Sequence, residues 1–286
     1  MQIMQEALKL FPPSVRDKLA KMPEIRSDAV EEVRCRNGQP YVVAVCNAEI
    51  PVSETNVCPA HLDYILEKAA DYSFHTRVKE FKAGFLHTGF GCRVGVCGTV
   101  TDGGLESVTS LSIRIPHEVR MCAQPVISEL TKDGFSSTLI IAPPGAGKTT
   151  LLRDLIRTLS AIGYRVSVAD DRGEIAAVFR RLPQFDLGPR TDIMSGGKKA
   201  ESCMKLLRAM NPQILALDEI TAPEDLSAIL CAAGCGVALL STAHAVSSEH
   251  LSDRPIYRQL LKERIFLRAI EINLVGDKRT YKVVNL

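Results

Sequence analysis

Hydrophobic and polar positions follow a different pattern in the first part of the chain than in the rest. The runs YVVAVC (41–46) and CRVGVCGTVT (92–101) predict strands, and the turn-rich segments RNGQP (36–40) and TDGG (101–104) bound them. The stretch AHLDYILEKAADYS (60–73) has apolar residues at helical spacing. These elements predict a small α+β domain.

From Ser137 onward, predicted strands alternate with predicted helices. The apolar runs typical of buried strands are TLIIA (138–142), YRVSVAD (164–170), QILALD (213–218) and VALLSTA (237–243). An amphipathic helix, TTLLRDLIRTLSAIG (149–163), follows the first of them. Such alternation predicts an α/β fold with a mostly parallel sheet covered by helices. We therefore expect an N-terminal α+β domain with its connector in residues 1–125 and an α/β domain in residues 126–286.

One apolar stretch is long enough to cross a bilayer, because Leu226–Val246 carries no Asp, Glu, Lys or Arg. Within it, however, EDLSAILCAAGCG (224–236) is typical of a helix that ends at glycines, and VALLSTAH (237–244) is typical of a buried strand. The α/β pattern therefore explains this stretch better than a membrane span does.

Composition narrows the class of protein. Hydrophobic residues make up 46% of the chain and charged residues 24%, which is ordinary for a folded globular protein. A net charge of +2 without a Lys/Arg run gives no support to a nucleic-acid partner. The nine cysteines have no framework spacing, and Cys231 and Cys235 lack a second pair of metal ligands. This usage indicates reduced thiols in a cytoplasmic protein.

The segment TLIIAPPGAGKTTLLRDLI (138–156) carries the strongest chemical signal. Its strand, glycine-containing loop and helix match a phosphate-binding loop (P-loop), although Ala142 stands where the stricter pattern has glycine. Loop N–H groups attract phosphates, Lys148 pairs with the β and γ oxygens of ATP, and Thr149 supplies a hydroxyl to Mg²⁺. The residues expected to cradle the nucleotide are Ala142, Pro143, Pro144, Gly145, Ala146, Gly147, Lys148, Thr149 and Thr150.

Two adjacent acids end a later apolar run, ILALDEI (214–220). The predicted strand places Asp218 at its carboxyl end, where ligands bind in open α/β sheets, and a carboxylate there can hold Mg²⁺ through water. Glu219 is positioned to polarise the attacking water. A second acid at this place favours an ATP hydrolase over most P-loop kinases and GTPases.

Further polar residues follow the other predicted strands. Asp170, Asp171 and Glu174 come after YRVSVAD, so at least one of them faces the same edge of the sheet, and the residues alone do not say which. His244 ends the strand that contains LLSTA, which makes it a candidate sensor of the γ-phosphate with Thr242 as a polar companion.

The segment Met194–Gly197 reads MSGG and looks like the signature loop of an ABC transporter ATPase. In those ATPases a long helical subdomain separates the P-loop from the signature, and the interval between Lys148 and Ser195 leaves no room for it. We expect Ser195 to be the N-cap of a helix instead. The expected apolar face of that helix comprises Ala200, Met204, Leu207 and Met210.

The chain resembles the stage III sporulation protein AA family, a branch of the type II/IV secretion ATPases, in four segments: APPGAGKTT, VADDRGEIA, GPRTDIMSGGKKAESCMKLLRAMNPQILALDEI and STAHA. EEVRCRNGQPYVV, GFGCRVGVCGTV and SLSIRIPHEV in the first domain are similar to the same family, so the resemblance covers nearly the whole chain.

By this resemblance the chain has four boxes. They are Walker A at Ala142–Thr149, an acidic box at Asp170–Glu174, Walker B ending at Asp218 and Glu219, and a histidine box at His244. The acidic box of the family usually reads Asp-Glu-Arg, whereas this chain has a second aspartate in the middle position. Glu174 and Glu219 are therefore the candidates for water activation.

The resemblance also implies an architecture and partners. It implies a RecA-like P-loop ATPase core in which the strand before His244 lies between the P-loop and Walker B strands. ATP and Mg²⁺ are the implied cofactors. Such ATPases are typically homo-oligomers, hexameric rings at the cytoplasmic face of a membrane, with integral membrane proteins of a secretion-like channel as partners. In a spore former this channel joins mother cell and forespore, and no nucleic acid is expected.

Phosphoryl transfer is accelerated when a cation reaches the γ-phosphate from outside the P-loop. Because related secretion ATPases close the N-terminal domain over ATP, we expect Arg93 or Arg114 to supply that cation, with Arg190 as the alternative. A nucleic-acid motor or helicase loader built on the same core stays open as a second hypothesis. A scaffold without turnover is disfavoured by Lys148 and the two Walker B acids.

Overall fold

The computed structural model describes residues 2–26, 30–45, 48–70, 80–81, 84–88, 91–101, 104–275 and 278–286. The chain forms two compact units. The first unit comprises Met1–His117 and Ala177–Gln184, and the second comprises Glu118–Ala176 and Phe185–Leu286. The division after His117 lies before the expected boundary at residue 125 and assigns the connector residues that follow it to the second unit.

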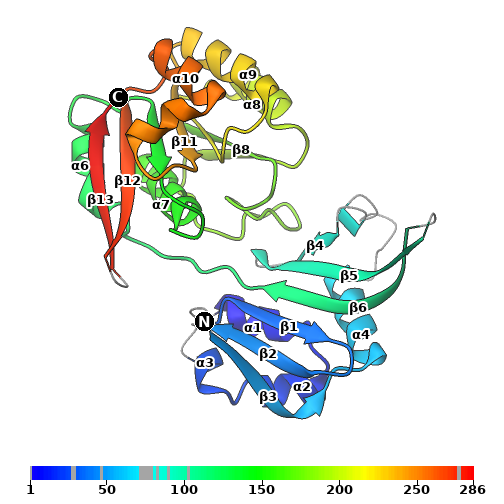
Figure 1. Ribbon diagram of the computed structural model, residues 1–286. Coiled ribbons are helices and arrows are strands. Elements are labelled where there is room, and N and C mark those ends of the chain that lie inside the picture. Colours follow the sequence, from blue (N-terminus) through cyan, green and yellow to red (C-terminus); the bar gives the residue numbers. More distant parts are fainter. Residues whose placement is uncertain are drawn as a thin grey trace. The chain divides into compact units, whose positions relative to one another are not determined.

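The first unit contains one antiparallel sheet with helices on one face (Figure 1). Its elements are α1 (Gln2–Leu8), α2 (Pro13–Leu19), α3 (Pro23–Arg26), β1 (Glu32–Arg36), β2 (Pro40–Val45), β3 (Ala48–Asn56), α4 (Pro59–Ala69), β4 (Phe85–His87), β5 (Arg93–Thr101) and β6 (Gly104–Arg114). The strand order is β3-β2-β1-β6-β5-β4, and every neighbouring pair is antiparallel. The predicted helix at 60–73 is α4, and residues 71–73 lie outside the described ranges.

Side chains alternate between the two faces of this sheet. Val33 and Cys35 of β1 are buried in one core with residues of α1, α2 and α4, whereas Glu32, Arg34 and Arg36 point to the other face. This is the inward and outward alternation of an antiparallel sheet that is covered on one side. The outward face of the first unit therefore carries charged residues in rows.

The second unit contains a seven-stranded sheet in the described residues. Its elements are α6 (Gln124–Thr131), β7 (Thr138–Ile141), α7 (Lys148–Ala161), β8 (Val166–Asp170), β9 (Thr191–Ser195), α8 (Lys199–Met210), β10 (Ile214–Leu217), α9 (Pro223–Gly234), β11 (Ala238–Ala243), η3 (Ser248–Asp253), α10 (Pro255–Lys262), β12 (Arg268–Val275) and β13 (Lys278–Asn285). The order is β13-β12-β7-β11-β10-β8-β9.

All neighbouring strands of this sheet are parallel except β12 and β13, which form an antiparallel hairpin. Every residue of β7, β8 and β10 is buried, so both faces of the sheet are covered. Helices α8, α9 and α10 share one core cluster with the strands, and α7 contacts β7, β8 and β11. Strand β11 lies between β7 and β10, as the family resemblance implies.

The apolar stretch 226–246 forms the end of α9 and all of β11. Among the described residues, the structure has no helix that is both long and apolar enough to span a membrane.

Two expectations about the MSGG segment are wrong. Ser195 is the last residue of β9, which pairs with β8, and α8 begins only at Lys199 with Lys198 as its N-cap. Gly196 and Gly197 both have φ of 76°, so they turn the chain between strand and helix. The helix is also rotated from the expected face, because its buried apolar residues are Cys203 and Leu206.

The four residues of the expected face of α8 lie at the edge of the core. Ala200, Met204 and Leu207 are only partly buried against the core, and Met210 is 40% exposed. Edge strand β9, read as Thr-Asp-Ile-Met-Ser, lacks the apolar run of a central strand, and every residue of it is at least partly exposed. Its pattern therefore does not predict a strand. For this reason the helix was expected to begin at Ser195, before its actual start at Lys199.

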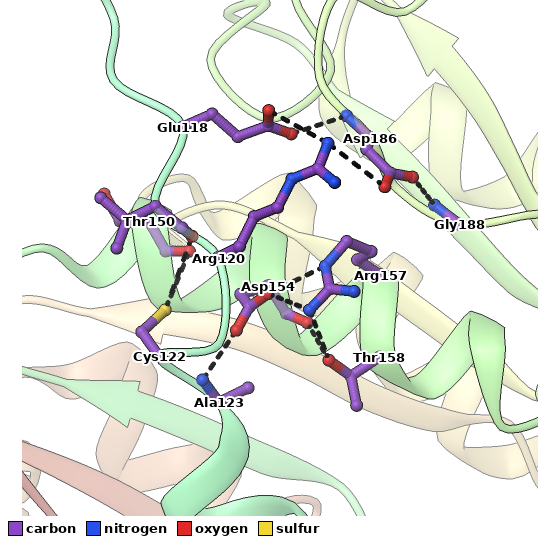
Figure 2. A network of polar contacts seen from close by, with 11 residues as sticks. Glu118, Arg120, Cys122, Ala123, Thr150, Asp154, Arg157, Thr158, Asp186 and Gly188 are labelled. Atoms are coloured by element: carbon purple, nitrogen blue, oxygen red, sulfur yellow. Dashed lines mark hydrogen bonds and ion pairs between the residues drawn. The ribbon is translucent and has the colours of Figure 1, made fainter. Parts of the chain in front are cut away.

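The connector is fastened to helix α7 by a buried carboxylate (Figure 2). The Ala123 N–H donates to Oδ2 of Asp154 at 2.8 Å, and Arg157 donates to Oδ1 through Nε at 2.9 Å and Nη2 at 2.6 Å. Burial alone would raise the pKa of Asp154, but the hydrogen bonds from Ala123 and Arg157 and the charge of Arg157 outweigh burial and hold that pKa below its usual range.

A second set of contacts ties the same connector to the loop before β9 (Figure 2). Nη2 of Arg120 lies 3.4 Å from Glu118 and 3.6 Å from Asp186, and the Asp186 N–H donates to Glu118 at 3.1 Å. The connector between His117 and α6 is thus bound to the loop before β9 as well as to α7.

Candidate active site

The parallel sheet brings four of the sequence motifs to one edge. Strands β8, β10, β11 and β7 are neighbours in that order, and each is parallel to the next. Parallel strands end on the same side, so the acidic box, Walker B, the histidine box and the P-loop meet at their carboxyl ends. This edge is the expected ligand site of an open α/β sheet.

The P-loop has the backbone that its glycines predict. Gly145 and Gly147 have φ of 76° and 97°, conformations in the left-handed region that glycine adopts without strain. A Cβ on Gly147 would also lie 3.1 Å from Nε of Arg279, which donates to the Ala146 carbonyl at 3.0 Å. Gly147 is therefore required by its backbone conformation, and a Cβ there would in addition displace the Arg279 side chain by a few tenths of an ångström.

Lys148 begins helix α7 and is 7% exposed. Its Nζ lies 3.0 Å from the carbonyl oxygens of both Ala142 and Pro143, and 2.7 Å from Nδ1 of His244. Burial lowers the pKa of Lys148, and the charges of Glu219 and Asp218 act in the opposite direction. An anion that binds the loop would compete with these neutral partners for the ammonium.

His244 links Lys148 to the second Walker B acid. An ammonium group only donates, so Nδ1 of His244 accepts from Lys148 and the ring proton is on Nε2. Nε2 lies 3.2 Å from Oε2 of Glu219, within ion-pair distance of that carboxylate. The other oxygen, Oε1, lies 3.3 Å from Nη1 of Arg254. Lys148, His244, Glu219 and Arg254 thus form one continuous row of contacts, here called the Lys148 row.

Asp218, the first Walker B acid, is held by hydrogen bonds from the neighbouring strand β11. Its Oδ1 accepts from Thr242 Oγ at 2.8 Å, and its backbone carbonyl accepts from Ser241 Oγ at 3.0 Å. Thr242 therefore orients the carboxylate of Asp218. Thr149, the second residue of α7, carries the hydroxyl expected at Mg²⁺.

The chemistry of these donors fits Mg²⁺ in a nucleotide complex. Among the described residues, no group of three or more His, Cys, Asp or Glu side chains is arranged to hold a metal by itself. Mg²⁺ prefers oxygen ligands and usually takes one or two from the protein, with phosphate oxygens and water completing its shell. A threonine hydroxyl and an oriented aspartate are such a pair.

The two aspartates of the acidic box make contacts within the protein. Asp170 is 1% exposed and accepts hydrogen bonds from the Ile175 and Ala176 N–H groups at 3.1 and 2.8 Å, so it closes its own loop. Asp171 Oδ1 lies 3.7 Å from Nζ of Lys199. Glu174 is partly buried, and its charge acts on the buried guanidinium of Arg153. The acid that lies in the Lys148 row is Glu219.

Arg93 and Arg114 lie together in the first unit. They are register partners at the ends of β5 and β6, and the Arg93 guanidinium lies 3.9 Å from the centre of the Phe85 ring. Together with Arg34 and Arg36, they line a pocket with a volume of about 410 Å³ on the outward face of the sheet. This surface, here called the arginine face, gathers both expected arginines.

Arg190 lies at the wrong end of the second unit to reach its own P-loop. Its N–H donates to Ser160 Oγ at 2.7 Å, and its Nη1 donates to the Gly163 carbonyl at 3.1 Å. Both partners are at the end of α7, whose 14 residues separate them from Lys148 by a helix roughly 20 Å long. Arg190 therefore lies far from Lys148 of its own chain.

Sequence reasoning missed three cations at the site. Arg254 pairs with Glu219, Arg279 contacts the P-loop, and the buried Nζ of Lys199 donates to the Glu219 carbonyl. The glycines of MSGG turn the chain so that Lys199 begins α8 beside the Glu219 carbonyl. The segment therefore has a structural role here that does not depend on an ABC signature. No local motif marks these residues; only the Lys-Lys pair directly after the glycines could have drawn attention to Lys199.

The chain was compared with known proteins. The family model described as "Sporulation stage III, protein AA" matches residues 1–284. The chain belongs to this family. It is 36% identical over 282 residues to the stage III sporulation protein AA of Bacillus subtilis (strain 168), covering 94% of this chain and 91% of that protein. The resemblance stated from the motifs is confirmed.

Two solved structures are similar to the fold. The ATPase DotB of Legionella pneumophila superposes with a TM-score of 0.64 at 14% identity, over 96% of this chain and 80% of that chain. The pilus retraction motor PilT with bound ADP gives a TM-score of 0.62 at 17% identity, over 92% of this chain and 82% of that chain. The chain therefore has a mixed α/β fold similar to that of DotB and PilT.

Proposed function

We propose that the chain is a Mg²⁺-dependent ATPase that works as a motor of the secretion type during sporulation. The observation that carries this proposal is the Lys148 row, in which the P-loop lysine, His244 and Glu219 are joined at the carboxyl ends of three neighbouring strands. The row places a phosphate-binding cation and a base candidate on either side of one imidazole. The sporulation family supports the cellular setting.

Each group in the row has a step in hydrolysis. The β and γ oxygens of ATP take the Lys148 ammonium from its carbonyl partners, and the loop amides and the start of α7 hold the phosphates. His244 then loses its donor at Nδ1, and because that nitrogen carries only a lone pair, a role of His244 as γ-phosphate sensor requires a proton at Nδ1. Glu219 accepts the proton of the attacking water. Thr149 and Asp218 would hold Mg²⁺, which would supply positive charge against that of the phosphates.

The arginine face is the part of the first unit that we propose to contact a nucleotide. We propose that Arg93 or Arg114 reaches the γ-phosphate of a nucleotide, within a homo-oligomer that is a hexamer, and that the chain acts peripherally at the cytoplasmic side of a membrane. Integral membrane proteins of a channel between mother cell and forespore are the proposed partners. Glu174 stays a second candidate for the base, in addition to Glu219. Glu174 belongs to the acidic box and Glu219 to Walker B, and both boxes lie at the carboxyl edge of the parallel sheet.

A second candidate function is a nucleic-acid motor, favoured by one observation. The arginine face combines four arginines and one carboxylate, Glu32, with Ser110, Ser112 and the Phe85 ring on an open sheet face, and its excess of positive charge suits a phosphate backbone. DNA that raises hydrolysis in a salt-sensitive way would favour this candidate. Stimulation by membrane partners without a DNA effect would favour the secretion motor.

The test of ATPase activity is Lys148→Ala in the full chain. Removal of the ammonium leaves charge on the β and γ phosphates that the loop amides alone do not offset, so we expect turnover to be abolished. Phosphate release under excess ATP and Mg²⁺ is the measurement, and Lys205→Ala, exposed on α8, is the matched control. Retention of more than about a tenth of the wild-type rate by Lys148→Ala would contradict the P-loop assignment.

A further inference from the structure

Arg254 occupies a position at the site that the sequence motifs do not mark. It lies between η3 and α10, is the N-cap of α10, and precedes Pro255, which begins that helix. Its side chain is 50% exposed, whereas its partner Glu219 is only 13% exposed. The guanidinium thus stands at the solvent side of the Lys148 row, where a ligand would enter.

The backbone that carries Arg254 is held firmly on the sheet. The hydroxyl of Tyr257, which is 1% exposed, lies 3.3 Å from the Ile220 carbonyl and 3.2 Å from the Thr242 carbonyl. Ser248 at the start of η3 donates to Glu271 of β12 through both N and Oγ at 2.8 Å. Arg254 is therefore presented from a support that is anchored to the strand ends of the site itself.

The charges around Arg254 suit an anion. The positive charge of Arg254 acts against that of Lys148 and helps lower the Lys148 pKa, and Glu219 lies between the two cations. A guanidinium binds phosphate oxygens through paired N–H groups, and only Nη1 of Arg254 contacts Glu219 in the structure. A terminal phosphate that binds near Lys148 would therefore attract Arg254 away from Glu219.

We propose that Arg254 binds the γ-phosphate of ATP held by its own chain, an inference that rests on the proposed ATPase function. Transfer of the guanidinium from Glu219 to the phosphate does two things. It makes binding depend on the third phosphate, and it frees Oε1 of Glu219 to accept a hydrogen bond from the attacking water. Arg254 then complements the arginine face, because it belongs to the unit that carries the P-loop.

The test compares ATP with ADP, because a residue that contacts only the γ-phosphate distinguishes them. Calorimetry on the full chain would measure the Kd of ADP and of adenylyl imidodiphosphate, each with Mg²⁺, for wild type, Arg254→Ala and Arg254→Lys. Arg258→Ala is the matched control, since this exposed arginine of α10 bonds to the Ser252 carbonyl instead. Phosphate release gives kcat and KM for the same variants.

We expect Arg254→Ala to weaken binding of the ATP analogue about tenfold while ADP binding stays unchanged, and to lower kcat by about tenfold or more. Arg254→Lys should recover part of the analogue affinity, and Arg258→Ala should match wild type. Equal weakening of both nucleotides would show a structural role only. Faster hydrolysis by Arg254→Ala would show that the residue merely restrains Glu219. Either result overturns the proposal.

The outcome for wild type separates this proposal from the function on which it rests. If the wild-type chain binds neither nucleotide, the ATPase function fails and the role of Arg254 fails with it. If wild type binds both and Arg254→Ala leaves the ratio of the two Kd values unchanged, only the role of Arg254 is overturned.

Discussion

The two sheets of this chain expose polar chemistry in different places. In the second unit, β7, β8 and β10 are buried along their whole length, so functional groups occur only where the parallel strands end. In the first unit, each antiparallel strand has one buried and one open side, so charged residues occur along the face of the sheet. A parallel sheet covered on both faces thus concentrates a site at its edge, whereas a half-covered sheet spreads one over its surface.

The contacts at the strand ends of the second unit are more buried than those on the arginine face of the first. At the strand ends, Lys148 and Asp218 are each less than 10% exposed and have short, directed partners. On the arginine face, Arg34 is 39% exposed and pairs with Glu32 at 2.8 Å and with Glu49 at 3.3 Å. Changes at the strand ends should therefore have large effects on chemistry, and changes on the open face smaller ones.

The largest effect is expected at the strand end of β10, from Glu219→Gln. The amide keeps the shape of the side chain and leaves Asp218 for Mg²⁺, but it no longer accepts a proton from water. We expect turnover to fall by roughly 10²- to 10⁴-fold with ATP still bound tightly. Single-turnover phosphate release and retention of labelled ATP are the measurements.

Glu174→Gln is the matched control for this prediction, since it removes the charge of the other base candidate in the acidic box. We expect it to retain most of the turnover. Normal hydrolysis by Glu219→Gln together with loss in Glu174→Gln would assign the base to the acidic box and reverse the two roles.

The next largest effect concerns stability, from Asp154→Asn inside the second unit. The substitution breaks the buried pair with Arg157, and breaking such a pair costs about 3–5 kcal/mol of the free energy of unfolding. Because the pKa of Asp154 is lowered in the folded state, its contribution is present above the unfolded pKa of about 3.9 and is lost as the pH falls below it. Urea unfolding at pH 7 and in acid measures both.

Arg34→Ala in the first unit provides the contrast to Asp154→Asn. The pair of Arg34 with Glu49 is exposed and contributes about 0–1 kcal/mol. Glu32 is only 13% exposed, but it keeps the hydrogen bond from Ser112 when Arg34 is removed, so the loss should be smaller than that from Asp154→Asn. A loss from Arg34→Ala as large as that from Asp154→Asn would contradict the distinction between a buried and an open arrangement of charge.

The smallest effect on the site itself is expected from the arginine face. We expect Arg93→Ala or Arg114→Ala to lower kcat by about tenfold with little change in ADP affinity, because the proposed contact is with the γ-phosphate only. Arg36→Ala, on the same face, is the control. Full turnover in both variants would remove the arginine face from catalysis and leave Arg254 as the remaining arginine at the γ-phosphate.

Much of the site in the second unit could be predicted from contiguous sequence. A P-loop is a strand, a loop and a helix read in one stretch, and Asp218, Glu219 and His244 follow apolar runs that are typical of buried strands. Because parallel strands end on one side, their polar ends meet wherever the strands are neighbours. The alternation of strands and helices was therefore enough to predict which motifs share an edge.

Tertiary structure decided which residues act together at that edge. Arg254 and Arg279 come from η3–α10 and β13, and no local spacing shows that these elements fold back over Glu219 and Ala146. Ser195 ends a strand instead of opening a helix because β9 pairs along β8, a choice made by a neighbour far away in the sequence. The physical reason is range: backbone preference and apolar spacing act over a few residues, whereas the partner of a charge or of a strand edge is set by how distant elements pack.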